Sequence, residues 1–126
     1  MKLTAKELRI GNLINFINYR PSEKGVLEQT LVTWEDIRMC VESIDFFHLY
    51  YKPIPLTEEW LLRMGAISNP YQDRYELGDL HFECDKTKGE TILWCEKYPH
   101  MKFVHQVQNY IYATKGEELT IKESVS

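Results

Sequence analysis

The stretch PIPLTEEWLLRMGA, residues 53 to 66, divides the sequence into two parts. Its prolines cannot donate to a strand ladder, so they end the segment before them. Thr57 has the position of a helix N-cap, and Glu58 and Glu59 fill the first turn, where carboxylates meet the positive end of the helix dipole. Gly65 suits the left-handed residue that ends a helix. The stretch therefore predicts a short helix that joins two sheet regions.

Upstream of this joint the sequence predicts mainly short strands. Thr4 and Glu7 have capping-box spacing, which indicates one helical turn at residues 5 to 8. Gly11 predicts a tight bend at the start of the first strand, and residues 18–25 have the composition of a loop. Strands are expected in RIGNLINFI (9–17), VLEQTLVTW (26–34), DIRMCVES (36–43) and FFHLYYKPI (46–54). Short strands at this spacing predict a small curled sheet or an SH3-like barrel.

Downstream of the joint the sequence predicts a loop and then a hairpin. The loop is ISNPYQDR (67–74), and the strands YELGDLHFECD (75–85) and ETILWCEKY (90–98) flank a four-residue turn. If Asp85 faces Glu90, Phe82 lies opposite Leu93. The alternating side chains would then form one apolar face and a second face. The apolar face would hold Leu80, Phe82, Cys84, Leu93 and Cys95, and the other His81, Glu83, Ile92 and Trp94.

The segment MKFVHQVQNYIYATKG (101–116) predicts a short strand that runs into a second helix. Val104, Val107 and Ile111 have the spacing of a buried stripe, and Gly116 marks the helix end. EELTIK (117–122) is expected to form a last short strand. We therefore predict an α+β fold with mostly antiparallel strands, an N-terminal curled sheet and two short helices packed on the sheets. Residues 1–126 would form a single domain with two sub-regions, 1–56 and 57–126.

Composition excludes several classes of function. The chain has 15 Lys and Arg against 19 Asp and Glu, spread without blocks of like sign, so the basic footprint of a nucleic-acid-binding protein is missing. No apolar run is long enough to span a bilayer, and MKLTAKELRIGN (1–12) lacks the apolar stretch expected of a signal peptide. Cys40, Cys84 and Cys95 form no paired framework, which indicates reduced thiols. We expect a soluble intracellular protein that binds neither nucleic acid nor membrane.

Metal binding and catalysis find little support in the spacing of candidate residues. His81, Cys84, Cys95, His100 and His105 include no CxxC or HxxxH pair, so no metal site is expected. No nucleotide-binding or hydrolase motif occurs, and no cofactor is expected. One catalytic alternative stays open, in which Cys95 pairs with His105 as an activated thiol.

A polar stripe on the second predicted helix is the main candidate site. His105, Gln108 and Tyr112 recur at i, i+3 and i+7, and Asn109 lies one turn after His105. With Trp94, these side chains would form a binding surface. Two other interpretations stay open: a solvated helix face, or a buried network that holds the sheet.

Three stretches resemble a family of small uncharacterised proteins from prophages and mobile elements of gut Bacteroidetes. The pattern comprises L-R-I-G-N at residues 8–12, I-P-L-T-E-E-W-L at 54–61, V-H-Q-V-Q-N at 104–109 and G-E-E-L at 116–119. The resemblance covers both ends and the middle of the chain. It implies an accessory protein that acts in the cytoplasm of a bacterial host, and it implies no catalytic residues.

The leading hypothesis is a non-catalytic protein that binds a host or phage protein. Abundant aromatic residues support it, and the surface around Trp94, Tyr110 and Tyr112 is the expected contact. One alternative is a protein that binds or sequesters a small ligand such as a signalling nucleotide, although its basic residues are scattered. Another is a small enzyme that uses Cys95 or His105. Self-association into a homo-oligomer also stays open.

Overall fold

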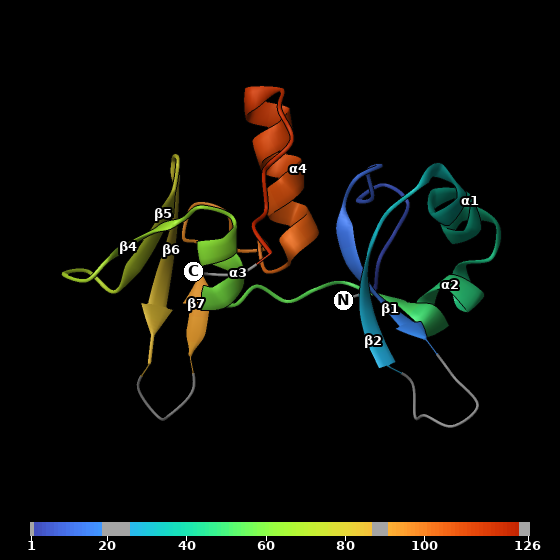
Figure 1. The fold of residues 1–126 in the computed structure, drawn as a ribbon, viewed down its shortest axis with the longest axis horizontal. Helices are drawn as coiled ribbons and strands as arrows, with labels where there is room; N and C mark the ends of the chain where they lie inside the picture. The colour runs from blue at the N-terminus through green and yellow to red at the C-terminus, as the bar shows by residue number, and fades with distance from the viewer. Residues whose placement is uncertain (1, 19–25, 87–90, 124–126) are drawn as a thin grey trace. The chain divides into compact units, whose positions relative to one another are not determined.

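The computed structural model describes residues 2–18, 26–86 and 91–123 (Figure 1). The chain forms two compact units. The N-terminal unit comprises Met1–Ile54 and Phe103–Tyr110, and the C-terminal unit comprises Pro55–Lys102 and Ile111–Ser126. The division falls within the predicted joint, two residues before the expected boundary of the sub-regions. The return of residues 103–110 to the first unit is a feature that the sequence pattern did not predict.

The N-terminal unit is an open antiparallel sheet with two helices. Strands β1 (Leu13–Asn18), β2 (Val26–Leu31) and β3 (Tyr51–Lys52) have the order β2-β1-β3. Helices α1 (Trp34–Glu42) and α2 (Ile44–Tyr50) lie on the same side of β1 and β2 (Figure 1). The α+β class is confirmed, and the SH3-like barrel is wrong because the described strands close no barrel.

The strands expected at 36–43 and for most of 46–54 are wrong, since these segments form α1 and α2. Thr33 begins α1 with a capping box: its hydroxyl accepts from the Asp36 N–H at 3.4 Å, and its own N–H donates to the Asp36 carboxylate at 2.9 Å. The helix turns Cys40 into the core and Val41 outward. The alternating apolar pattern in residues 36–43 arises because α1 carries apolar residues on more than one face, and it does not indicate a strand.

The core of the N-terminal unit gathers side chains from the N-terminal segment, β1, α1, α2 and β3. Phe47 stacks on Tyr51 with ring centroids 4.3 Å apart, and the Tyr51 hydroxyl donates to Asp36 at 2.9 Å. Gly11 has φ 96°, which confirms the predicted bend. The fully or almost fully buried members of this core are Leu3, Leu8, Ile14, Val32, Cys40 and Phe47.

The C-terminal unit begins with the predicted short helix. Helix α3 (Glu58–Arg63) has Thr57 as its N-cap, whose hydroxyl accepts from the Trp60 N–H at 3.2 Å. Gly65 has φ 94° directly after the helix, so its left-handed conformation is confirmed.

Four antiparallel strands follow, β4 (Ile67–Asn69), β5 (Arg74–Leu77), β6 (Leu80–Asp85) and β7 (Ile92–Trp94), in the order β4-β5-β6-β7. The single strand expected at 75–85 is wrong, because Gly78 turns the chain with φ 61° and makes a hairpin of β5 and β6. The loop expected at 67–74 contains β4, whose three residues are too few to show a period.

The predicted faces of the β6–β7 hairpin are confirmed, while its register is wrong. Cys84 pairs with Leu93 and Asp85 with Ile92, a shift of two residues from the expected opposition. A shift of two preserves which side chains share a face. Accordingly Phe82 and Cys84 are buried, and Ile92 and Trp94 are exposed.

Helix α4 (Val104–Lys115) confirms the second predicted helix. Val104, Val107 and Ile111 are buried, and Gly116 follows the helix with φ 69°. The described part of the chain thus has four helices, where two were expected. The strand expected at 117–122 is wrong; this segment is irregular, and the Lys122 N–H donates to the Arg63 carbonyl at 2.8 Å.

Candidate interaction surface

His105 faces the interior of the N-terminal unit. Its side chain is fully buried, and its Nε2 lies 3.3 Å from Oε2 of Glu7. Burial lowers the pKa of His105, and the neighbouring Glu7 carboxylate offsets only part of that shift. The imidazole is therefore neutral at pH 7. Its Nδ1 has no hydrogen-bond partner among the described residues.

Gln108 and Asn109 bind the backbone that leads into β1. Gln108 is buried, and its Oε1 accepts from the Leu13 N–H at 2.7 Å. Asn109 donates to the Glu7 carbonyl at 2.6 Å and accepts from the Asn12 side chain at 2.8 Å. Of the interpretations of the polar stripe, a buried network describes His105 and Gln108, and the half-buried Asn109 is bonded beside them.

Trp94 and Tyr112 belong to the C-terminal unit and are exposed, by 37% and 44%. They are therefore accessible to a partner, whereas His105 and Gln108 are not. Of the five predicted site residues, the structure brings His105, Gln108 and Asn109 together in the N-terminal unit, while Trp94 and Tyr112 belong to the C-terminal unit.

The cysteines are buried in the units to which they belong. Cys95 lies in the C-terminal unit and His105 in the N-terminal unit, each almost wholly screened from solvent. Burial also raises the pKa of the Cys40 and Cys84 thiols. Cys40 and Cys84 thus favour the thiol over the nucleophilic thiolate.

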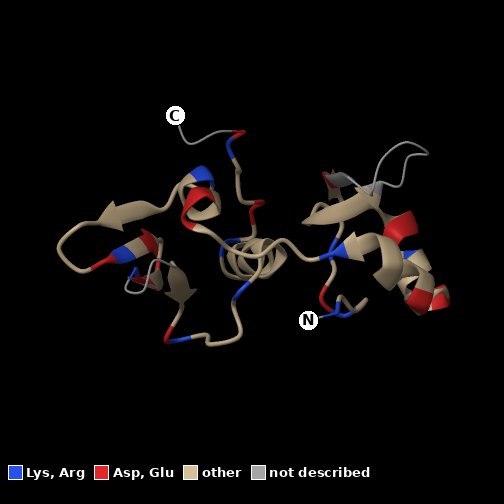
Figure 2. Cartoon of the chain, turned by 90° about the horizontal axis from the view of Figure 1, so that it is seen from below, with Lys and Arg blue, Asp and Glu red and all other residues tan. Residues whose placement is uncertain are grey.

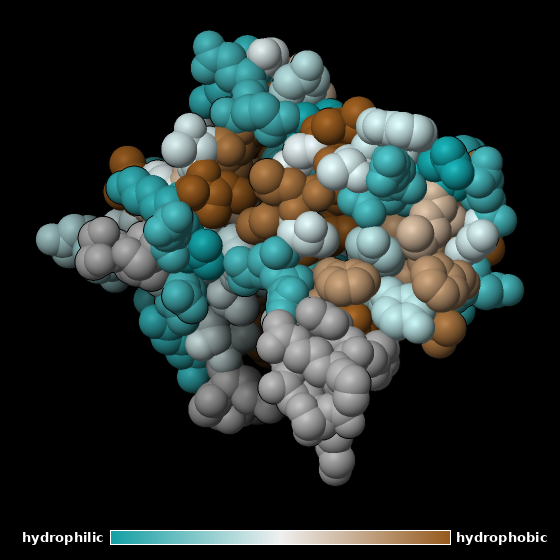
Figure 3. All heavy atoms as spheres, turned by 45° about the vertical axis from the view of Figure 1, so that its right-hand side comes forward, coloured by the Kyte–Doolittle hydropathy of each residue, from teal (hydrophilic) through white to brown (hydrophobic). Residues whose placement is uncertain are grey.

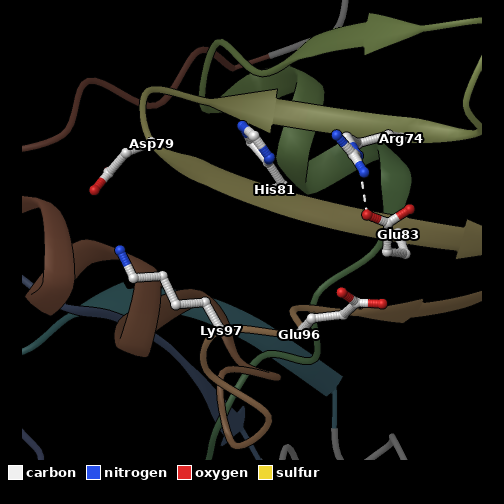
Figure 4. Close-up of a pocket in the computed structure, with 6 residues that line it drawn as sticks. All are labelled: Arg74, Asp79, His81, Glu83, Glu96 and Lys97. Atoms are coloured by element: carbon white, nitrogen blue, oxygen red, sulfur yellow. Dashed lines mark hydrogen bonds and ion pairs between the residues drawn. The ribbon is translucent and has the colours of Figure 1, made fainter.

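A polar cavity of about 400 Å³ lies in the C-terminal unit (Figure 4). Arg74 and Glu83 form an ion pair across its wall at 2.9 Å. Its lining residues are Arg74, Asp79, His81, Glu83, Glu96 and Lys97. Carboxylates are as numerous here as basic side chains, so the cavity does not select a phosphate.

Glu58 connects α3 with the sheet of the C-terminal unit. Tyr75 donates its hydroxyl to Glu58, and Lys86 forms an ion pair with the same carboxylate at 3.1 Å. Burial, followed by this hydrogen bond, raises the pKa of Tyr75 to about 12. Tyr75 therefore stays protonated as a structural donor.

The most exposed apolar region of the N-terminal unit lies on α1 and α2. Five large apolar side chains point outward, and we call them the helix-pair surface: Trp34 (57% exposed), Val41 (66%), Ile44 (39%), Phe46 (49%) and Leu49 (62%). Apolar side chains lie among polar ones on the side of the molecule where α1 and α2 come forward (Figure 3). Where exposed apolar side chains join into one patch of more than a few hundred Å², the patch marks an interaction site.

Local sequence explains why these residues face outward. The capping box at Thr33 sets the start of α1, and with it the rotation that buries Cys40 and exposes Val41. In α2 the helical period likewise places Phe47 on the buried side and Phe46 and Leu49 on the exposed side. Sequence analysis missed this surface because it assigned both segments to strands; the T-x-x-D spacing at Thr33 was the signal that could have found it.

Acidic side chains outnumber basic ones along α1 and α2, and Lys52, two residues after α2, donates to the His48 carbonyl at 2.7 Å. Between residues 34 and 50 the sequence has four carboxylates and one cation, Arg38. Figure 2 shows the acidic positions in red along α1 and α2. The carboxylates are Glu35, Asp36, Glu42 and Asp45.

Neither a metal site nor a membrane-spanning helix is found in the described part of the chain. Within residues 2–18, 26–86 and 91–123, no group of three or more His, Cys, Asp or Glu is arranged to hold a metal ion. Every helix in the same ranges is too short or too polar to cross a bilayer. Comparison with protein-family models, with curated proteins and with solved structures finds no match to this chain.

Proposed function

We propose that this chain is a non-catalytic binding protein that engages a protein partner through the helix-pair surface. The supporting observation is the exposure of five large apolar side chains between Trp34 and Tyr50. Covering such groups gains about 25 cal/mol for each Å² of apolar area removed from water. Trp34 is of a residue type that often dominates the binding energy of protein interfaces.

The exposed side chains are separable from the core, which makes the proposal testable. Cys40 and Phe47 fill the interior from the same helices, while Val41 and Leu49 stand in solvent. Polar substitution of an exposed residue usually changes the free energy of unfolding by less than about 0.5 kcal/mol. Loss of binding in such variants would therefore report the contact itself.

The resemblance to prophage and mobile-element proteins supports the setting. On this basis we propose that the chain is an accessory protein in the cytoplasm of a bacterial host and that its partner is a host or phage protein. Trp94 and Tyr112 offer a second accessible place for contact.

Affinity capture from host lysate, quantified by mass spectrometry, tests the proposal. We expect wild-type protein to enrich a partner that the Val41→Asp/Leu49→Asp variant loses. The matched control is Trp94→Ala/Tyr112→Ala, which alters exposed side chains of the other unit and should retain the partner. Circular dichroism and urea unfolding check that each variant folds.

Two results would overturn the assignment of this surface. Loss of the partner only in Trp94→Ala/Tyr112→Ala would move the contact to the C-terminal unit. Capture of the same proteins by all three forms would show that neither surface binds a partner.

A further inference from the structure

We propose that the occupant of the helix-pair surface is a basic amphipathic helix of a partner protein. This inference rests on the proposed function and adds the chemistry of the partner. It follows from the charge around the surface, the hollow beside it and the kind of backbone that presents it.

The carboxylates differ in whether they are already engaged. Asp36 is bonded to Thr33 and Tyr51, and Glu42 pairs with Arg38 at 3.4 Å. Glu35 and Asp45 are exposed, and no side-chain partner is found for either among the described residues. Each lies in the first turn of its helix, where the dipole favours a carboxylate. Their charge nevertheless faces solvent, so Lys or Arg of a partner can pair with them.

A hollow on α1 provides a place for one such cation. It has a volume of about 380 Å³ and is lined by Glu35, Arg38, Met39, Glu42 and Ser43. Arg38 also lies over the Trp34 ring, 5.8 Å from its centroid, so this hollow adjoins the helix-pair surface. Because Arg38 already pairs with Glu42 in this hollow, a partner's lysine would pair with Glu35, and its methylene stem can contact Met39.

The backbone favours a helical occupant over an extended one. An added β-strand needs the free N–H and C=O groups of a sheet edge. The backbone groups of α1 and α2 are instead used in hydrogen bonds within each helix. Recognition must then come from side chains. At 1.5 Å per residue, α1 and α2 are about 14 and 10 Å long, which suits apolar anchors on two to three turns of a partner helix.

The same charges disfavour the other occupants. A second copy of this chain would bring carboxylates against carboxylates if it docked through the same surface. Nucleic acids and anionic lipid surfaces carry the same sign of charge and would be repelled. A basic helix is the occupant that satisfies both the apolar and the acidic components.

Fluorescence anisotropy with labelled synthetic peptides tests the inference. The probe is a short helix with leucine on one face and lysine on the other. Its controls are the same peptide with glutamate in place of every lysine, and a scrambled lysine–leucine peptide without an apolar face. We expect the basic amphipathic peptide to bind at least about tenfold tighter than either control, with affinity falling as salt rises.

Protein variants separate charge from apolar contact. Glu35→Lys/Asp45→Lys should reverse the preference between the lysine and glutamate peptides, and Leu49→Asp should abolish binding of both. Glu117→Lys/Glu123→Lys changes the net charge equally at exposed positions outside α1 and α2, and should leave the preference unchanged.

The outcomes distinguish this inference from the proposed function. Equal binding of both amphipathic peptides, lost in Leu49→Asp, would overturn the basic partner and leave the surface as a docking site. Failure of all peptides, with lysate capture still dependent on Val41 and Leu49, would overturn the helical occupant alone. A dimer in sedimentation that Leu49→Asp dissociates would make a second copy the occupant. If the Val41→Asp/Leu49→Asp variant also captures the same proteins as the wild type, the proposed function is overturned as well.

Discussion

Asn109 and Gln108 show why carboxamides occupy the inward side of α4. The bend at Gly11 leaves backbone N–H and C=O groups before β1 without sheet partners. A carboxamide both donates and accepts, so one side chain can satisfy both kinds of group. Gln108 does this with its bond from the Leu13 N–H and its bond to the Gly11 carbonyl at 3.3 Å. A hydrophobic residue at either position would leave buried polar groups unmet.

Because His105 is buried, we expect the free energy of unfolding to depend on pH. Its pKa is lowered in the folded state, so the unfolded chain binds the proton more readily. The free energy of unfolding should therefore fall as pH drops below about 6.5, by up to about 1.4 kcal/mol per pH unit for one proton. Above that pH both states are neutral at this position, and the contribution is constant.

Urea unfolding of wild type and His105→Gln between about pH 7 and pH 5 measures this effect. We expect the variant to lose less stability on acidification, because its amide does not titrate. The exposed His100→Gln variant is the control and should follow the wild type. Equal slopes for wild type and His105→Gln would contradict a buried neutral imidazole.

At the scale of elements, the position at which α1 starts determines which of its side chains are buried and which are exposed. Ile37, Met39 and Val41 alternate with charged residues and so mimic a strand with one wet face. The capping box at Thr33 favours the helix locally, and the burial of Cys40 in the same core as Phe47 completes the choice. The helix-pair surface is the consequence, since a strand would have exposed a different set.

Removal of the Thr33 hydroxyl should measure the value of that cap. Thr33→Ala is expected to lower the free energy of unfolding by about 0.5–2 kcal/mol, because the Asp36 N–H loses its acceptor. Thr33→Ser keeps the hydroxyl and should stay within a few tenths of a kcal/mol of wild type. Chemical denaturation followed by circular dichroism makes the comparison. If the two variants are equally stable, the cap contributes nothing.

At the scale of the whole molecule, the two units are interleaved along the chain. The N-terminal unit is incomplete until Phe103–Tyr110 has been added, although the whole sheet region of the C-terminal unit lies between. Val104, His105, Val107 and Gln108 are buried, and the Gln108 carboxamide binds the backbone of Gly11 and Leu13, almost one hundred positions earlier. A boundary drawn once through the sequence cannot describe such a protein.

A chain that ends at Lys102 should therefore lose the native N-terminal unit. We expect amide resonances of residues 7–13 to collapse toward unfolded positions, because their partners on α4 are missing. A chain that ends at Gly116 retains all of α4 and should keep those resonances. Nitrogen–proton correlation spectra compare the two. Unchanged resonances in the shorter chain would contradict the role of residues 103–110.

Local and periodic signals determined a large part of this fold. The cap at Thr57, the left-handed Gly65, the buried stripe of α4 and the faces of β6 and β7 each depend on neighbours within a few residues, and each is confirmed. Other features were decided by contacts between distant segments: the helical state of residues 36–43, the register of β6 with β7, and the inward orientation of His105, Gln108 and Asn109. The physical reason is that a polar residue on a helix is equally suited to water and to a buried partner. Gln108 is buried because α4 packs against the bend at Gly11, whose carbonyl it binds. Val41 and Leu49 are exposed because Phe47 and Cys40 fill the core from the same helices.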